Sequence, residues 1–175
     1  MLRQIRVRYD ALEDRLQLTL TTDAQTHHLL LTRRVWTRAR VALQRLLDLS
    51  AETPASLPRS VRDSISAAHH QAVASQTAAV REAAPAAGAP ADAVLVTGLR
   101  LGERKPTAEG GDGAQRSWVL LFALNGRSDL RLVLKDKTLH ALVGALLQRE
   151  DTAGWALPAL PARAALLPEN KPTLQ

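Results

Sequence analysis

The chain has 175 residues, of which 46% are hydrophobic, and this suits one domain or two small lobes that share a core. It contains no cysteine, so disulfides and thiolate metal sites are excluded. The formal net charge is +6, and most of the excess lies in residues 1–50, where nine arginines accompany five acidic residues. Such a charge allows nucleic-acid binding, although an arginine-rich composition also produces it without any function.

Neither a targeting signal nor a membrane span is expected. The first residues alternate between basic and apolar types and lack the continuous apolar segment of a signal peptide. The longest apolar run, Trp118 to Leu124, is far shorter than a membrane span. We therefore expect a cytoplasmic protein without membrane contacts.

Residues 1–50 are predicted to form three strands and a helix. Apolar and polar residues alternate over 5–9 and 16–20, as in half-buried strands, and the polar residues 10–14 form a turn between them. A third strand is expected over 27–31, after which Thr32 can cap a helix. The apolar face of that helix comprises Val35, Trp36, Ala39, Leu43, Leu46 and Leu47.

Residues 51–92 are predicted to be a linker that contains one alanine-rich helix. Ser60 and Asp63 resemble a capping box at its start, and the helix is expected to end before Pro85. Proline-rich segments flank it on both sides. A narrow stripe of mostly small residues is expected to pack inward, namely Val61, Ile65, Ala68, Ala72, Ala79 and Ala83.

Residues 93–151 are predicted to repeat the first arrangement. Strands are expected over 94–101, 118–124 and 129–134, followed by a helix over 136–150. The pair Asn125-Gly126 is a strong hairpin signal between the last two strands.

The two halves align without a gap over their last strand and helix. Residues 29–43 match residues 132–146, so that Leu31 meets Leu134, and Trp36 meets Leu139. We therefore predict an α+β fold of internally duplicated βββα units, with an intervening helix and an irregular proline-rich tail over 152–175. The units are expected to stack around a pseudo-twofold axis, in one continuous sheet or in two facing sheets.

This order of elements is broadly similar to that of the single-strand-binding PUR-repeat and Whirly proteins. Their units have four strands before the helix, whereas this chain shows three, and no diagnostic motif is shared. The likeness is one of topology and carries no function to this chain.

The histidines are not predicted to form a metal site. They occur as His27-His28, His69-His70 and His140, and no carboxylate stands at a recurrent ligand spacing beside either pair. Adjacent residues on a strand point to opposite faces, so His27 and His28 are unsuited to one ion. No metal and no cofactor are therefore expected.

No catalytic motif is present in the sequence. The glycine-rich residues 110–113 lie between two predicted strands and lack the helix start that a phosphate loop requires. Asp10, Glu13 and Asp14 share one turn, where a cation or acid–base role is conceivable, but turns select aspartate for backbone reasons. We therefore expect a protein that is not an enzyme.

Basic residues form the strongest candidate for a binding surface. A basic sheet face beside two helix starts can follow phosphates. Only five residues are aromatic and most of them belong to the predicted core, which argues against base stacking. A solvated arginine-rich face is the alternative. The candidate residues for nucleic acid or another anion are Arg6, Arg8, Arg33, Arg34, Arg38, Lys135 and Lys137.

The tail offers a second candidate surface. Trp155, Leu157 and Leu160 are isolated apolar residues that can dock on the chain itself or on a neighbouring subunit. Residues 158–163 also match a PxxPxR pattern, which an aromatic groove can recognise, and simple disorder is a third interpretation.

The leading functional hypothesis is a non-enzymatic accessory or adaptor subunit that acts by binding within a larger bacterial-type assembly. A protein partner or self-association is expected, because edge strands, a small-residue helix and the tail all suit docking. The runner-up is a nucleic-acid-binding module that contacts phosphates. A small enzyme of unknown reaction comes third.

Overall fold

One mixed sheet and three helices make up the α+β fold of the computed structural model, which describes residues 2–77, 80–82, 88–104, 116–158 and 160. The sheet has seven strands in the order β4-β1-β2-β3-β5-β6-β7. The strands are β1 (Leu2–Asp10), β2 (Arg15–Thr22), β3 (Thr26–Thr32), β4 (Val80–Glu82), β5 (Val94–Arg104), β6 (Ser117–Leu124) and β7 (Leu130–Lys135). The helices are α1 (Arg33–Ser50), α2 (Arg59–Ala74) and α3 (Asp136–Thr152).

The β1–β2 turn and the start of α1 form as the sequence predicts. The Asp10 carboxylate accepts hydrogen bonds from the backbone N–H groups of Leu12 and Glu13, at 3.0 and 3.3 Å, and so closes the turn. At the end of β3, the Thr32 hydroxyl accepts a hydrogen bond from the Val35 N–H and caps α1. Both features are confirmed.

The two three-stranded meanders join into one continuous sheet. β3 and β5 pair in parallel, with Leu29 opposite Val94, while the pairs within each meander are antiparallel. The first strand of each meander therefore points in the same direction. The expectation of one continuous sheet is confirmed, whereas the pseudo-twofold relation of the two units stays a prediction.

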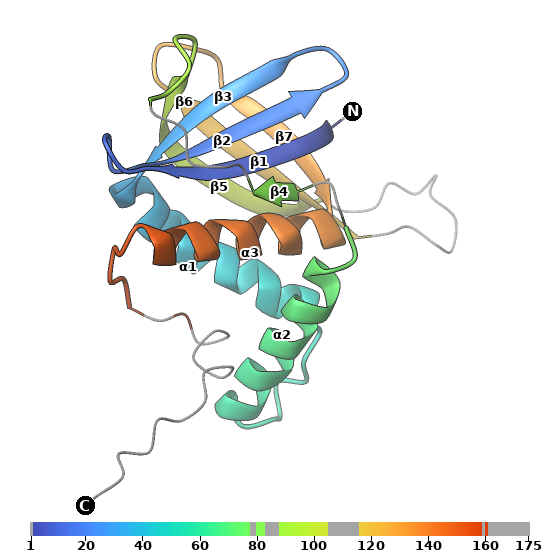
Figure 1. Cartoon of the computed structure of the whole chain (residues 1–175). Coiled ribbons are helices and arrows are strands. Elements are labelled where there is room, and N and C mark those ends of the chain that lie inside the picture. The colour runs from blue at the N-terminus through green and yellow to red at the C-terminus, as the bar shows by residue number, and fades with distance from the viewer. Residues whose placement is uncertain (1, 78–79, 83–87, 105–115, 159, 161–175) are drawn as a thin grey trace, which may run out of the picture.

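The sheet curves around the helices that cover its inner face (Figure 1). α1 contacts β3 and β5, whereas α3 contacts β1 and β4 as well as β6 and β7, which lie at opposite ends of the strand order. One core of buried apolar side chains fills the space between. Trp36, Trp118 and Phe122 are at most 1% exposed within it, which confirms their predicted place in the core.

A buried ion pair joins α1 to α3. The guanidinium of Arg40 lies 3.4 Å from the Glu150 carboxylate, and both side chains are almost fully buried. The indole N–H of Trp36 donates a hydrogen bond to the other oxygen of Glu150 at 2.5 Å. The two helices are therefore fixed to each other by a polar contact inside an apolar core.

The intervening helix differs from its prediction. α2 begins at Arg59, with Pro58 at the N-cap and no side-chain cap, so the predicted Ser60–Asp63 capping box is wrong. The helix ends at Ala74, well before Pro85, and β4 follows it. A shorter helix leaves the chain free to add a parallel strand beside β1.

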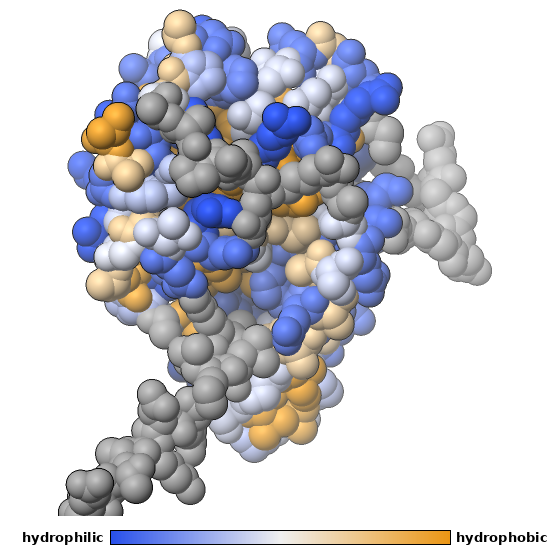
Figure 2. Space-filling view, in the orientation of Figure 1, coloured by the Kyte–Doolittle hydropathy of each residue, from blue (hydrophilic) through white to orange (hydrophobic). Residues whose placement is uncertain are grey.

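The buried side of α2 is also different from the predicted stripe. Val61 and Ile65 are 42% and 39% exposed, while Ser66 and Ala67 face the protein. Figure 2 shows apolar atoms on the surface at the lower end of the molecule, where α2 lies in Figure 1. The polar side of α2 faces inward because it has polar partners there. Ala79 and Ala83 lie outside the described residues.

The start of the tail packs on the body of the protein. Trp155 is buried, its ring meets Tyr9 edge to face at 6.0 Å, and its indole N–H donates to Asp14 at 2.5 Å. Arg33 donates a hydrogen bond to the Trp155 backbone carbonyl at 2.8 Å. The tail therefore links the β1–β2 turn to the start of α1.

Replacement of this anchor should destabilise the whole fold. Trp155→Ala removes a buried indole and its hydrogen bond, so we expect a loss of about 3–5 kcal/mol in the free energy of unfolding, measured by chemical denaturation. Leu12→Ala is the control, because Leu12 is 82% exposed, and it should change stability little. Equal stability of the two variants would contradict the anchoring role.

Candidate functional site

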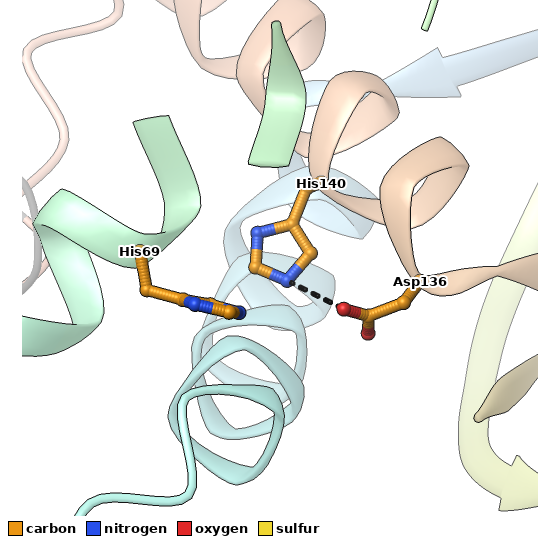
Figure 3. Close-up of side chains that lie close together, drawn as sticks. All are labelled: His69, Asp136 and His140. Atoms are coloured by element: carbon orange, nitrogen blue, oxygen red, sulfur yellow. Dashed lines mark ion pairs between the residues drawn. The ribbon is translucent and has the colours of Figure 1, made fainter. Parts of the chain in front are cut away.

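Polar side chains from all three helices converge at one partly buried point. We call this group the helix-junction cluster: Ser50 at the end of α1, His69 and His70 on α2, and Asp136 and His140 on α3. Figure 3 shows His69 reaching from α2 toward Asp136 and His140 on α3. The cluster thus collects residues that are far apart in the sequence.

The Ser50 hydroxyl lies at the centre of the cluster. Its oxygen is 2.9 Å from each carboxylate oxygen of Asp136, 2.9 Å from His140 Nε2 and 3.3 Å from His69 Nε2. Among the groups around Ser50, His140 Nε2 lies 3.7 Å from Asp136 Oδ2. Three side chains therefore face one oxygen atom.

A second layer of contacts orients the cluster. The indole N–H of Trp118, on β6, donates to Asp136 Oδ1 at 2.7 Å. His70 Nδ1 lies 3.0 Å from His140 Nδ1, and the His140 side chain is fully buried. Trp118 therefore orients the carboxylate of Asp136, and His70 orients the imidazole of His140.

The proton count of these contacts is consistent with neutral imidazoles. Ser50 has one hydroxyl proton, which suits donation to the carboxylate of Asp136, so His140 Nε2–H donates to the Ser50 oxygen. His140 Nδ1 is then free to accept from His70 Nδ1–H. A serine nucleophile needs an imidazole acceptor that a carboxylate orients. Here the Asp136 carboxylate contacts the serine directly, at 2.9 Å, so the arrangement differs from that triad.

Burial shifts the histidines toward the neutral form. The pKa of His140 is lowered to about 4, chiefly by desolvation; the carboxylate of Asp136 opposes the shift, and the neighbouring His70 and His69 contribute to it. Desolvation also lowers the pKa of His70, with a smaller effect from His69. Both rings are therefore neutral near pH 7.

The cluster contains a set of atoms with metal-ligand chemistry. His69, Asp136 and His140 each offer one ligand atom, and these atoms all lie within 4.8 Å of one another. Two imidazole nitrogens and a carboxylate oxygen form a ligand set common in zinc proteins.

The sequence contains one local signal for this cluster, although no metal site was predicted from it. Asp136 and His140 stand four residues apart on a predicted helix, so they share one face. His69 carried no such signal, because its position depends on how α2 packs against α3. Ser50 was equally hidden at the end of α1.

The turn carboxylates have separate partners. Asp10 is buried and accepts hydrogen bonds from the turn backbone and from Gln17. Glu13 lies 3.3 Å from Arg15. Hydrogen bonds from Trp155 and then Tyr9 lower the pKa of Asp14. These three carboxylates therefore act in the turn and in the tail contact.

The predicted basic surface is divided between two layers. Arg6 and Arg8 lie on the outer face of the sheet, opposite the buried Ile5 and Val7. Arg8 donates hydrogen bonds to Gln17 and to the Gly88 carbonyl, at 2.6 and 2.5 Å. A chain segment thus covers part of the outer face.

The remaining basic candidates lie on other elements. Arg34 and Arg38 are exposed on α1, in the helical layer, and Arg33 is bound to the tail. Lys135 ends β7 and Lys137 lies in the first turn of α3. The structure does not bring these seven residues onto one surface.

The tail candidates lie against the protein itself. Trp155 and Leu160 are buried and Leu157 is partly buried against the core. Of the PxxPxR pattern over 158–163, only Pro158 and Leu160 are described. The rest of that pattern and the glycine-rich residues 110–113 lie outside the described residues.

A cavity of about 500 Å³ lies beside α1 and the start of α2. Its charged residues are mixed in sign, and Asp48 and Asp63 already contact Gln44, Ser66 and Arg59. The cavity has no convergent set of reactive groups. Its charged lining residues are Arg40, Arg45, Asp48, Arg59, Arg62 and Asp63.

No protein-family model matches this chain, and no curated protein or solved structure matches it. No helix in the described part of the chain is long and apolar enough to cross a membrane. The candidate sites therefore rest on the geometry of the chain itself.

The helix-junction cluster predicts a loss of stability in mild acid. His140 stays neutral down to about pH 4 in the folded protein, whereas the unfolded chain takes up this proton near pH 6.5. The contribution of neutral His140 to the free energy of unfolding is therefore fully present above about pH 6.5. It is lost as the pH drops toward 4, and the loss is on the order of 3 kcal/mol.

Denaturant unfolding at several pH values, in buffer with a chelator, measures this effect. His140→Gln removes the titrating ring and should flatten the dependence between pH 6.5 and 4, even though the variant is less stable at pH 7. His28→Gln is the control, since it changes a histidine outside the cluster. Parallel profiles for the His140→Gln variant and the unmodified chain would contradict the prediction.

Proposed function

We propose that this protein is a non-enzymatic adaptor of the cytoplasm that binds an extended, acidic segment of a partner protein along strand β7. The observation that supports this most is the free edge of the sheet at β7. Within the described residues, β7 pairs with β6 on one side and with no strand on the other. An edge strand of this kind offers backbone N–H and C=O groups to an added strand.

The other edge of the sheet is less suited to a partner. β4 has only three residues and pairs in parallel with Ile5–Val7 of β1. Short edge strands are a common protection against added strands. β7 has six residues and is thus the longer of the two edges.

The charge on β7 indicates the partner's chemistry. Arg131 and Lys135 are exposed on the outer face of the strand, on either side of Val133, which is 38% exposed. Neither cation forms a salt bridge within the described residues. A strand with acidic side chains at alternate positions would place its carboxylates on this outer face and the side chains between them on the inner face, level with Leu132 and Leu134.

We further propose that the fold arose by internal duplication of a βββα unit, with residues 51–92 inserted between the copies. The matched residues support this, because Leu31 and Leu134, like Trp36 and Leu139, are at most 1% exposed. The helices α1 and α3 also begin at matched positions. In this interpretation the copies share a core and differ in surface, and the free edge belongs to the second copy.

A peptide titration tests the adaptor function. The probe is a short peptide with glutamate at alternate positions and valine between them. We expect binding that weakens with salt and changes the NMR signals of the β7 amides. The double variant Arg131→Glu, Lys135→Glu should reduce the affinity about tenfold or more, because two attractive pairs become repulsive.

A matched control separates this edge from a general basic surface. Arg34→Glu with Arg38→Glu makes the same charge change on α1 and should leave peptide binding intact. A single-stranded oligonucleotide is the comparison probe, since nucleic acid is the alternative partner. Failure of the acidic peptide to bind, equal losses in both double variants, or tighter binding of the oligonucleotide would overturn the proposal.

A further inference from the structure

We propose that the helix-junction cluster is a binding site for a divalent transition-metal ion, with zinc as the best match, held by His69, Asp136 and His140. This site is independent of the β7 edge. It uses residues from two helices, with a fourth donor from a third helix.

The donor types favour zinc over hard cations. Imidazole nitrogen suits Zn²⁺, Cu²⁺ or Ni²⁺, whereas Ca²⁺ and Mg²⁺ prefer sites made of oxygen atoms. Zn²⁺ takes a tetrahedral set of nitrogen and oxygen donors at about 2.0–2.2 Å. Two histidines and one carboxylate supply three of those four positions.

Ser50 completes the shape of the site. Donors around one tetrahedral zinc ion lie roughly 3–4 Å from each other. The Ser50 oxygen lies 2.9 Å from Asp136, 2.9 Å from His140 and 3.3 Å from His69, and His140 lies 3.7 Å from Asp136. The donors of the three ligands are within 4.8 Å of each other. The four groups therefore outline an irregular tetrahedron, and an ion at its centre would replace the hydrogen bonds of Ser50 by coordination.

The contacts behind the ligands are those that a metal site requires. Trp118 N–H holds Asp136 Oδ1, which leaves Oδ2, the oxygen 3.7 Å from His140, available to an ion. His70 lies behind His140, at 3.0 Å between the two Nδ1 atoms. If Nε2 of His140 binds an ion, the ring proton resides on Nδ1, which then donates a hydrogen bond to His70 Nδ1. Such outer contacts fix the orientation and tautomer of ligating groups.

The location gives the ion a structural role. His69 lies on α2, which has no side-chain cap and exposes part of its apolar side, while Asp136 and His140 lie on α3 beneath the sheet. An ion shared between them would fix α2 to the core. An ion that binds the folded state and not the unfolded chain stabilises the folded state by mass action.

The test uses the full chain without an affinity tag, stripped with a chelator and titrated with Zn²⁺. We expect one equivalent to bind and to raise the melting temperature, and Co²⁺ to give the intense visible absorption of tetrahedral coordination. His69→Ala, in a half-buried residue, and Asp136→Asn, which keeps the side-chain size, should each weaken Zn²⁺ binding at least tenfold.

The histidine pair on β3 provides the matched control. His27→Ala with His28→Ala removes two histidines outside the cluster and should leave the affinity unchanged. A Zn²⁺ titration without heat or thermal shift, octahedral Co²⁺ spectra, or unchanged binding in folded His69→Ala protein would overturn the proposal. Loss of binding only in the β3 variant would assign the ion to the surface and overturn it as well.

Discussion

The buried ion pair between Arg40 and Glu150 is the contact on which the arrangement of helices depends. Two charges inside an apolar core are tolerated only when each is paired and further hydrogen-bonded, and Trp36 supplies one of those bonds to Glu150. The geometry of the pair fixes α1 against α3. The helix-junction cluster uses the same alignment, because its Ser50 on α1 meets Asp136 and His140 on α3.

The same polar layer explains why α2 packs as it does. Its inward face carries three polar side chains, each of which has a hydrogen-bond partner on another helix. Ser66 contacts Asp48, His69 contacts Ser50 and His70 contacts His140. An apolar stripe would remove one hydrogen bond from each of these three partners, and a typical hydrogen bond contributes about 0.5–1.5 kcal/mol. The helix therefore turns its polar side inward and leaves part of its apolar side exposed.

Much of the fold could be predicted from the sequence, because alternation along the strands and the apolar face of α1 depend on local periodicity. The caps and turns at Asp10 and Thr32 are also local signals. The orientation of α2 could not be predicted, since it follows from partners contributed by other helices. The candidate site was only half visible for the same reason: Asp136 and His140 share a helix face, but His69 and Ser50 join them only through packing.

The parallel pairing of β3 and β5 has a consequence for how the chain folds. Neighbours at this junction, such as Leu29 and Val94, are separated by the whole of α1, α2 and β4. Contacts between residues so distant in sequence carry a large loop-closure cost and form late in folding. Until β5 arrives, the first meander presents β3 as an unprotected edge. During synthesis, this transient edge is open to pairing with other chains.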